Sequence, residues 1–260
     1  MDMKSDFTLH TPDLDRIEQG QEYFILSRNG AEEKIRFHDY DRIFEIPGLY
    51  EHLFYERYRC NSPQVVCGLL KEHLNGWHPA GSSLKALDIG AGNGMVGEEL
   101  VNIGVDEVVG VDIIEEAAQA LKRDRPGLYK DYFVADLTNL PSEVENSLAQ
   151  DGFNCMTVVA ALGFDDIPPE AFAQGFNFVS SPGWVAFNIK EDFVCDEDTS
   201  GFCRLIGLLD EEGVLEIRER RRYRHRFCQD GTPLYYYAVV GQKKADIPLE
   251  LLDAVNAEAI

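Results

Sequence analysis

From Leu84 onward, short apolar runs alternate with longer stretches in which apolar and polar residues are mixed. Runs of this length are typical of buried β-strands. The predicted strands are Lys85–Ile89, Glu107–Asp112, Asp131–Ala135, Cys155–Ala160 and Trp184–Lys190, with predicted helices between them. Strands that alternate with helices indicate a parallel sheet with helices on both faces.

The two ends of the chain follow other patterns. Two strand-like runs surround Asn29-Gly30, a dipeptide that favours the tight turn of a β-hairpin. Residues 1–20 are polar and are predicted to be loosely ordered. Towards the other end, Asp230-Gly231 separates two strand-like runs, which are predicted to pair as an antiparallel hairpin.

A helical pattern precedes the alternating region and runs from Leu49 to Leu74. The dipeptide Ser62-Pro63 interrupts it. Serine is a preferred N-cap, and proline is favoured at the first position of a helix. A new helix is therefore predicted to begin here, with Ser62 as its N-cap.

An arginine-rich segment, RERRRYRHR, begins at Arg218. Read as a strand, it places every second residue from Arg218 to Arg226 on one face, and Tyr223 and His225 on the opposite, apolar face. We expect the arginines to form a solvated face paired with acidic side chains. A dimer contact, or contact with an anionic substrate or a nucleic acid, is the alternative.

Charge narrows the range of partners. The 260 residues include 24 Lys and Arg against 46 Asp and Glu, a formal net charge of −22. Such a surface repels phosphate backbones, so no nucleic-acid partner is expected. It fits either a solubility-adapted acidic surface or attraction of a cationic substrate. The sequence has no apolar run of transmembrane length and no secretion signal, so a cytoplasmic location without a membrane partner is expected.

Neither cysteine nor histidine spacing indicates a metal. The six cysteines are scattered without a C-x-x-C pair, and reduced, mostly buried thiols are expected. The run HDYD, from His38 to Asp41, is expected to be a turn or a helix cap. No metal site is predicted.

The stretch ALDIGAGNGMVGEEL joins the first predicted strand to a helix, and two cofactor templates fit it. Gly92, Gly94 and Gly97 match G-x-G-x-x-G, the dinucleotide pattern. Asp88 with Gly90, Gly92 and Gly94 matches D-x-G-x-G-x-G, the S-adenosylmethionine pattern. Both patterns use glycines for a sharp turn that approaches the ligand, next to a helix N-terminus.

Asp88 favours the second template. A pyrophosphate gains nothing from a carboxylate two residues before the turn, whereas S-adenosylmethionine carries an ammonium and a sulfonium and has no phosphate. Asp112, at the end of the next predicted strand, is placed to bind ribose hydroxyls under either template.

Further motifs follow in order, and the set resembles the class I S-adenosylmethionine-dependent methyltransferases. LDIGAGNGMVGEEL is similar to their motif I, VVGVDII to the second, DYFVADLTNLP to the third and FNCMTVVAALGFDDIPPEAF to the fourth. SPGWVAFNIKEDF is similar to the strand that follows. GLYEHLFYERY faintly resembles a Tyr-rich helix of small-molecule members of the methyltransferase-like 27 type. The chain departs from the family at Asn154, commonly Asp, and at Pro182-Gly183, often Gly-Gly.

The resemblance implies an α/β fold, a Rossmann-like seven-stranded, mostly parallel sheet with an antiparallel last strand and helices on both faces. The predicted N-terminal hairpin is not part of that core and, with the helices that follow it, is expected to form an N-terminal cap. The resemblance divides the chain into an extension with a β-hairpin (1–45), a methyltransferase domain (46–244) and a C-terminal tail (245–260). A monomer or homodimer is expected.

The resemblance also implies the cofactor site. The glycine turn would pass the methionine part, Asp88 would position its amino end, Asp112 would accept the ribose hydroxyls, and Asp136 with Leu137 would meet the adenine, whose face Ile113 would cover. Ala160 would leave space for the acceptor, and Tyr50 would contact the cofactor carboxylate. The implied cofactor-binding residues are Tyr50, Asp88, Gly90, Ala91, Gly92, Gly94, Asp112, Ile113, Asp136, Leu137 and Ala160.

Methyl transfer from a sulfonium is an in-line displacement that needs mainly alignment and exclusion of water. A hydroxyl acceptor would also need a general base. The candidates are His225, Tyr40 and Lys190, with Tyr223 and Asp165 as further ones; no spacing singles one out.

The sequence thus predicts a methyltransferase that uses S-adenosylmethionine, yields S-adenosylhomocysteine and acts on a small molecule. A catalytically silent S-adenosylmethionine-binding regulatory module, an NAD-dependent oxidoreductase and a protein-methylating enzyme are the alternatives.

Overall fold

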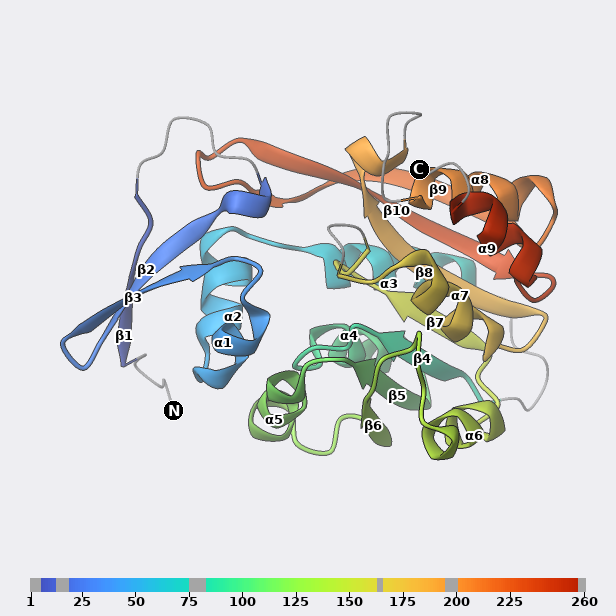
Figure 1. The fold of residues 1–260 in the computed structure, drawn as a ribbon, viewed down its shortest axis with the longest axis horizontal. Helices are drawn as coiled ribbons and strands as arrows, with labels where there is room; N and C mark the ends of the chain where they lie inside the picture. The colour runs from blue at the N-terminus through green and yellow to red at the C-terminus, as the bar shows by residue number, and fades with distance from the viewer. Residues whose placement is uncertain (1–5, 13–18, 75–82, 163–165, 195–200, 257–260) are drawn as a thin grey trace.

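The computed structural model describes residues 6–12, 19–74, 83–162, 166–194 and 201–256. It contains two sheets (Figure 1). The smaller sheet, near the N-terminus, has the order β1-β2-β3 and consists of β1 (Phe7–His10), β2 (Tyr23–Arg28) and β3 (Ala31–Arg36).

The larger sheet has the order β6-β5-β4-β7-β8-β10-β9. Its strands are β4 (Lys85–Ile89), β5 (Glu107–Asp112), β6 (Asp131–Val134), β7 (Cys155–Val158), β8 (Gly183–Lys190), β9 (Leu215–Phe227) and β10 (Pro233–Lys243). The first five run parallel, while β10 is antiparallel to both β8 and β9. The predicted fold class, the five parallel strands and the closing hairpin are confirmed.

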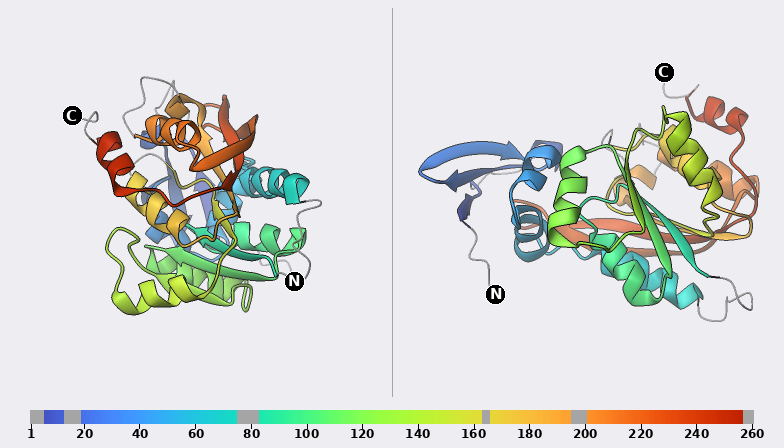
Figure 2. Two further views of the ribbon diagram at one scale, coloured as in Figure 1. Left: turned by 90° about the vertical axis from the view of Figure 1, so that its right-hand side faces the viewer. Right: turned by 90° about the horizontal axis from the view of Figure 1, so that it is seen from below.

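Helices cover both faces of the larger sheet (Figure 2). One hydrophobic cluster joins the sheet to α3 (Ser62–Leu74), α4 (Met95–Ile103) and α5 (Glu115–Asp124). The other cluster joins it to α6 (Ser142–Gln150), α7 (Pro169–Asn177), α8 (Phe202–Glu211) and α9 (Leu249–Asn256). Helix α9 lies in the segment predicted as a C-terminal tail, where Leu251 and Val255 are buried.

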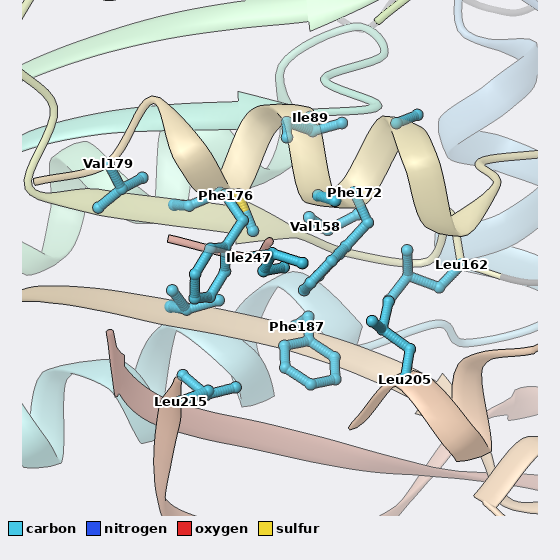
Figure 3. Close-up of a cluster of buried hydrophobic side chains, with 14 of the residues drawn as sticks. Ile89, Val158, Leu162, Phe172, Phe176, Val179, Phe187, Leu205, Leu215 and Ile247 are labelled. Carbon is cyan, nitrogen blue, oxygen red and sulfur yellow. The ribbon is translucent and has the colours of Figure 1, made fainter. Parts of the chain in front are cut away.

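Alternation along the central strands explains how one sheet serves two cores. In β4, Leu87 and Ile89 belong to the cluster under α6 to α9, whereas Ala86 belongs to the cluster under α3 to α5. Figure 3 shows Phe172 of α7 against Phe187 of β8 in the cluster under α6 to α9. Their ring centroids lie 5.6 Å apart in an edge-to-face arrangement. Full burial of such a side chain contributes about 1.5–3 kcal/mol.

The N-terminal sheet is built on the predicted hairpin. Asn29 and Gly30 have φ angles of 53° and 78°, and positive φ at both central residues gives the twist that a two-residue hairpin needs. The expectation that residues 1–20 are loosely ordered is wrong for β1, because Phe7–His10 pairs with β2. A four-residue strand is too short to show alternation, and Phe7 is buried.

We call the part from β1 to Tyr58 the cap, because one hydrophobic cluster runs from Phe7 to Tyr58 and crosses the boundary predicted at residue 45. Besides the small sheet it contains η1 (Gln19–Gln21), α1 (Tyr40–Glu45), α2 (Leu49–Glu51) and the π-helical turn η2 (His52–Arg57). The small sheet projects from one side of the molecule (Figure 2, right). Helix α1 packs against α5.

The far end of the β9–β10 hairpin reaches the cap (Figure 1). The amide of Phe227 donates to the carbonyl of Tyr58 at 2.8 Å. Glu22 and Arg226 form an ion pair that is almost completely buried, and the Glu22 carboxylate also accepts from the amide of Gln229 at 2.7 Å. The cap is therefore attached to the larger sheet by polar as well as apolar contacts.

The prediction that all five alternating arginines share a solvated face is wrong at Arg226. Arg224 pairs with Tyr235 of β10, and Arg226 pairs with Leu234, the residue next to Tyr235. His225 therefore has no partner of its own and is an extra residue in β9. Such a β-bulge breaks the alternation of side chains. His225 and Arg226 are therefore both buried. The expected acidic partners are present for other arginines, as for Arg222, whose Nε lies 2.6 Å from Glu191.

Ser62 is not the N-cap of α3. The first helical hydrogen bond runs from the amide of Val65 to the carbonyl of Asn61, so the cap position falls one residue earlier. The Ser62 hydroxyl instead contacts Tyr223 and His225 of β9, at 2.7 and 2.6 Å. Pro63 is the second residue of the helix.

Among the described residues, no helix has the length and apolar character to cross a membrane. Cys60, Cys67, Cys155, Cys203 and Cys228 are free thiols, and Cys195 lies outside the described residues.

Candidate active site

A cavity of about 330 Å³ opens at the carboxyl ends of the parallel strands. Strand β4 has β5 on one side and β7 on the other, so the strand order reverses at β4. Open α/β sheets bind ligands at such a point. We call this space the main cavity.

The glycine turn after β4 forms one wall of the main cavity. Gly90 has a φ of 66°, and a Cβ there would lie 2.8 Å from the Cβ of Ala161, so only glycine fits. Gly90 and Gly92 line the cavity. Ala91 is buried against the core, and Gly94 precedes α4; neither lines the cavity.

Asp112 closes the end of β5 and lines the main cavity with an exposed fraction of 9%. Its Oδ2 accepts from the amide of Gly92 at 2.8 Å, and its Oδ1 accepts from the amide of Ile114 at 2.9 Å. Burial raises the pKa of this carboxyl group, while the amide donors oppose the shift. Each oxygen retains a further lone pair with which to accept a ligand hydroxyl.

The loop after β6 supplies a second polar group and an apolar wall. Asp136 and Leu137 line the cavity, and the Asp136 Oδ1 accepts from the amide and hydroxyl of Thr138 at 2.8 and 2.7 Å. The Thr138 hydroxyl lowers the pKa of Asp136 most. Ile113 also lines the cavity while 63% exposed, which is unusual for a large apolar side chain.

Asp88 lies behind the glycine turn and does not line the main cavity. It is 1% exposed, its Oδ2 accepts from the Tyr129 hydroxyl at 2.6 Å, and its Oδ1 accepts from the Thr157 hydroxyl at 2.7 Å. Burial raises its pKa to about 7. The carboxyl group thus ties β4 to β7 and to Tyr129.

The raised pKa of Asp88 predicts a pH-dependent stability. From about pH 4 to about pH 7 the folded protein retains a proton that the unfolded chain has lost, so the free energy of unfolding falls as the pH rises, by up to about 1.4 kcal/mol per unit from this group. Above that range the contribution is constant. In Asp88→Asn this decline should be absent, as urea titrations across the range would show.

The exposed carboxyl of Asp131 provides the matched control for this experiment, because Asp131→Asn makes the same chemical change at an exposed position of β6. A stability difference between wild type and Asp88→Asn that stays constant with pH would contradict the prediction.

Ala160 follows β7 at the inner end of the main cavity and has a φ of 57°, a conformation rare for alanine. Its amide donates to the Oδ1 of Asn188 at 2.6 Å. The Nδ2 of Asn188 donates to the Tyr223 hydroxyl at 2.7 Å, and that hydroxyl contacts Ser62, which in turn contacts the Nδ1 of His225. This buried chain of hydrogen bonds holds Ala160 in place from behind.

A second cavity of about 40 Å³ lies on the other side of Ala160 and is called the inner cavity. Tyr40, Tyr50, Ala160 and Asp166 line both cavities. The inner cavity adds cap residues, among them Phe54 and Tyr55, and His225, Arg226 and Tyr236 of the β9–β10 hairpin.

The structure separates the candidate bases. His225 and Tyr40 line the inner cavity, whereas Lys190 lines neither cavity and forms an ion pair with Asp192. Burial, assisted by Arg226, holds the pKa of His225 well below its ordinary value, and burial raises that of Tyr40 well above it. Tyr223 is bound within the chain of hydrogen bonds, and Asp165 lies outside the described residues.

Sequence reasoning missed several lining residues of the main cavity, among them Phe44 and Asp166. Phe44 of α1 packs against Tyr50 in a tilted arrangement with ring centroids 4.6 Å apart, and both side chains line the main cavity. Asp166 stands next to the candidate Asp165 in a motif that was identified, but the sequence does not distinguish the two acids. No described group of three or more His, Cys, Asp and Glu side chains is arranged to hold a metal ion.

Comparison with known proteins agrees with this geometry. Residues 87–187 match the family model of a methyltransferase domain. A search of the curated proteins found no match.

Solved structures share the fold. A candidate RNA methyltransferase from Pyrococcus horikoshii is 15% identical, with a TM-score of 0.53 over 74% of this chain and 87% of that chain. The N-methyltransferase NodS from Bradyrhizobium japonicum, solved with S-adenosyl-L-homocysteine, is 14% identical, with a TM-score of 0.52 over 80% of this chain and 97% of that chain.

The matched domain contains the glycine turn, Asp112 and Asp136, and it spans the strands whose carboxyl ends form the main cavity. The chain therefore contains a methyltransferase domain of the S-adenosylmethionine-dependent kind, in a fold that it shares with solved methyltransferases.

Proposed function

We propose that this methyltransferase acts on a small molecule that binds in the inner cavity. The observation that supports this most strongly is the small size of that cavity. Its volume is about 40 Å³, and side chains of the cap and of the β9–β10 hairpin surround it. Such a space admits a compact reactive group, whereas an RNA strand or a protein side chain would need an open approach.

We propose that the cofactor lies along the main cavity. Asp112 accepts the ribose hydroxyls through the lone pairs that the amides of Gly92 and Ile114 leave free. Asp136 and Leu137 meet the adenine, and Ile113 covers its face, which explains why this side chain is 63% exposed in the cavity wall.

The methionine part then passes Gly90 and Gly92, with Tyr50 at its carboxylate and Ala160 beside the sulfur. Asp88, Ala91 and Gly94 support the turn from behind. In this arrangement Ala160 is the passage between cofactor and acceptor, because it lines both cavities.

S-adenosylmethionine supplies a methyl group on a good leaving group, so the protein's task is alignment and exclusion of water. Phe44, Tyr40 and Tyr50 of the cap cover the cavities and exclude water. The hydrogen bond from the Ala160 amide to Asn188 fixes the position of Ala160 where the two cavities meet. The acceptor is thereby confined to the side of the methyl group opposite the sulfur.

The proposal is tested by tracing the methyl group. The protein is incubated with methyl-labelled S-adenosylmethionine and, separately, a filtered metabolite extract, total RNA and a protein fraction. We expect S-adenosylhomocysteine release and label in the metabolite reaction. Label confined to RNA or protein would contradict the proposal, and binding of the cofactor without turnover would indicate a catalytically silent module.

A further inference from the structure

Aromatic rings dominate the inner cavity. Tyr40, Tyr50 and Phe54 lie on its cap side, with the centroids of Tyr50 and Phe54 5.1 Å apart. Tyr236 lies on the hairpin side, stacked on His225 at 4.1 Å. The faces of aromatic rings attract cations, particularly where water is excluded.

Two basic side chains of this lining, Arg226 and His225, contribute little free positive charge. Arg226 is bound to Glu22 in the buried ion pair, and its Nη1 also donates to the carbonyl of Phe227 at 2.8 Å. Burial and the nearby guanidinium of Arg226 keep His225 neutral near pH 7 by lowering its pKa. An anionic acceptor would therefore find no available counter-ion in these two groups.

Asp166 is the acidic residue at the junction of the two cavities. Its side chain is 31% exposed, and its Oδ2 lies 3.7 Å from the Nδ1 of His38, beyond hydrogen-bond distance. Within the described part of the chain, no hydrogen-bond donor reaches this carboxylate. A partly buried carboxylate without a donor is costly, and a ligand that donates to it recovers that cost.

We propose that the acceptor is an aliphatic amine, whose ammonium form is bound by Asp166 between the rings of Tyr40 and Tyr50. The inference rests on the proposed function and specifies its substrate class. An alcohol or a thiol would bring no positive charge to Asp166, and a carboxylate would be repelled by it. The net charge of −22 attracts the same class of molecule over longer distances.

Methyl transfer to the amine needs only Asp166 as the proton acceptor and S-adenosylmethionine as the methyl donor. The bound ammonium gives one proton to the Asp166 carboxylate, which exposes the nitrogen lone pair. The nitrogen forms a bond to the methyl carbon while the sulfur–methyl bond breaks, and the electron pair of that bond stays on sulfur. The products are a methylated ammonium and S-adenosylhomocysteine, and Asp166 returns its proton to water.

The test identifies the methylated atom. Labelled products from the metabolite reaction are separated, and the atom that carries the methyl group is assigned by mass spectrometry and NMR. Label on nitrogen of a small amine is expected. Label on oxygen, sulfur or carbon would overturn the amine assignment while leaving the proposed function intact, whereas label in RNA or protein alone would overturn both.

Variants test the role of Asp166 itself. Asp166→Asn should lower kcat/KM for the identified amine about 30-fold, because it removes a hydrogen bond to a charged group. Its affinity for S-adenosylhomocysteine should stay within about twofold of wild type, because the cofactor contacts proposed for Asp112 and Asp136 remain. Asp41→Asn, an exposed acid on α1, is the matched control. Equal kcat/KM values in the two variants would overturn the role assigned to Asp166.

Discussion

Asp112→Ala is expected to weaken the binding of S-adenosylhomocysteine about 100-fold. Two hydrogen bonds from ribose hydroxyls to one carboxylate are charge-assisted, and the loss of both corresponds to about 3 kcal/mol. Isothermal titration calorimetry measures the change directly. The low exposure of Asp112, 9%, strengthens the expectation, because water replaces the lost contacts poorly in a buried site.

Two controls separate binding from folding. Asp112→Asn keeps one oxygen for the amides of Gly92 and Ile114 and should lie between wild type and alanine. Asp131→Ala removes an exposed carboxyl from the next strand and should leave the affinity unchanged. If a folded Asp112→Ala protein bound the product within about threefold of wild type, the ribose assignment would be wrong.

Glu22→Gln is expected to lower the free energy of unfolding by about 3–5 kcal/mol, because it leaves the Arg226 guanidinium buried without its counter-ion. Chemical denaturation followed by tryptophan fluorescence measures the loss. The same substitution weakens the acceptor position used by the amide of Gln229, which contributes further.

The double substitution Glu22→Gln with Arg226→Met distinguishes a charge effect from a packing effect. Replacement of a buried ion pair by groups of similar volume is often close to neutral. The double variant should therefore be more stable than Glu22→Gln alone. If Glu22→Gln lowered the free energy of unfolding by less than about 1 kcal/mol, the ion pair between Glu22 and Arg226 would not be what attaches the cap.

The sequence predicted the part of the site that local patterns determine. Gly90, Gly92, Asp112 and Asp136 stand at fixed offsets from the ends of predicted strands, and all four line the main cavity. The carboxyl ends of adjacent parallel strands meet at one edge of a sheet, so strand order alone brings these residues together.

The remaining part depends on contacts between distant segments. Phe44 and Tyr40 reach the cavities because α1 packs against α5, and no local signal records that contact. Asp88 has the position in the motif that the family pattern requires, yet its hydrogen bonds to Tyr129 and Thr157 place it behind the turn. Spacing fixes the position of a residue along a strand but does not identify its hydrogen-bond partners.

The arginine-rich strand shows a second limit. Strict alternation would place His225 and Arg226 on opposite faces, but the bulge turns both inward. The position of a bulge depends on the register with the partner strand, so the residues of β9 alone do not predict it.

The bulge at His225 consequently brings two different side chains to the inner side of β9. It supplies an imidazole to the wall where the acceptor binds and a guanidinium to the joint that fastens the cap. Deleting His225 would restore regular alternation between Arg224 and Arg226, so the guanidinium would keep its inward position while the imidazole would be lost. A lineage that lost this single residue would therefore change the wall of the inner cavity while the cap stayed fastened to the larger sheet.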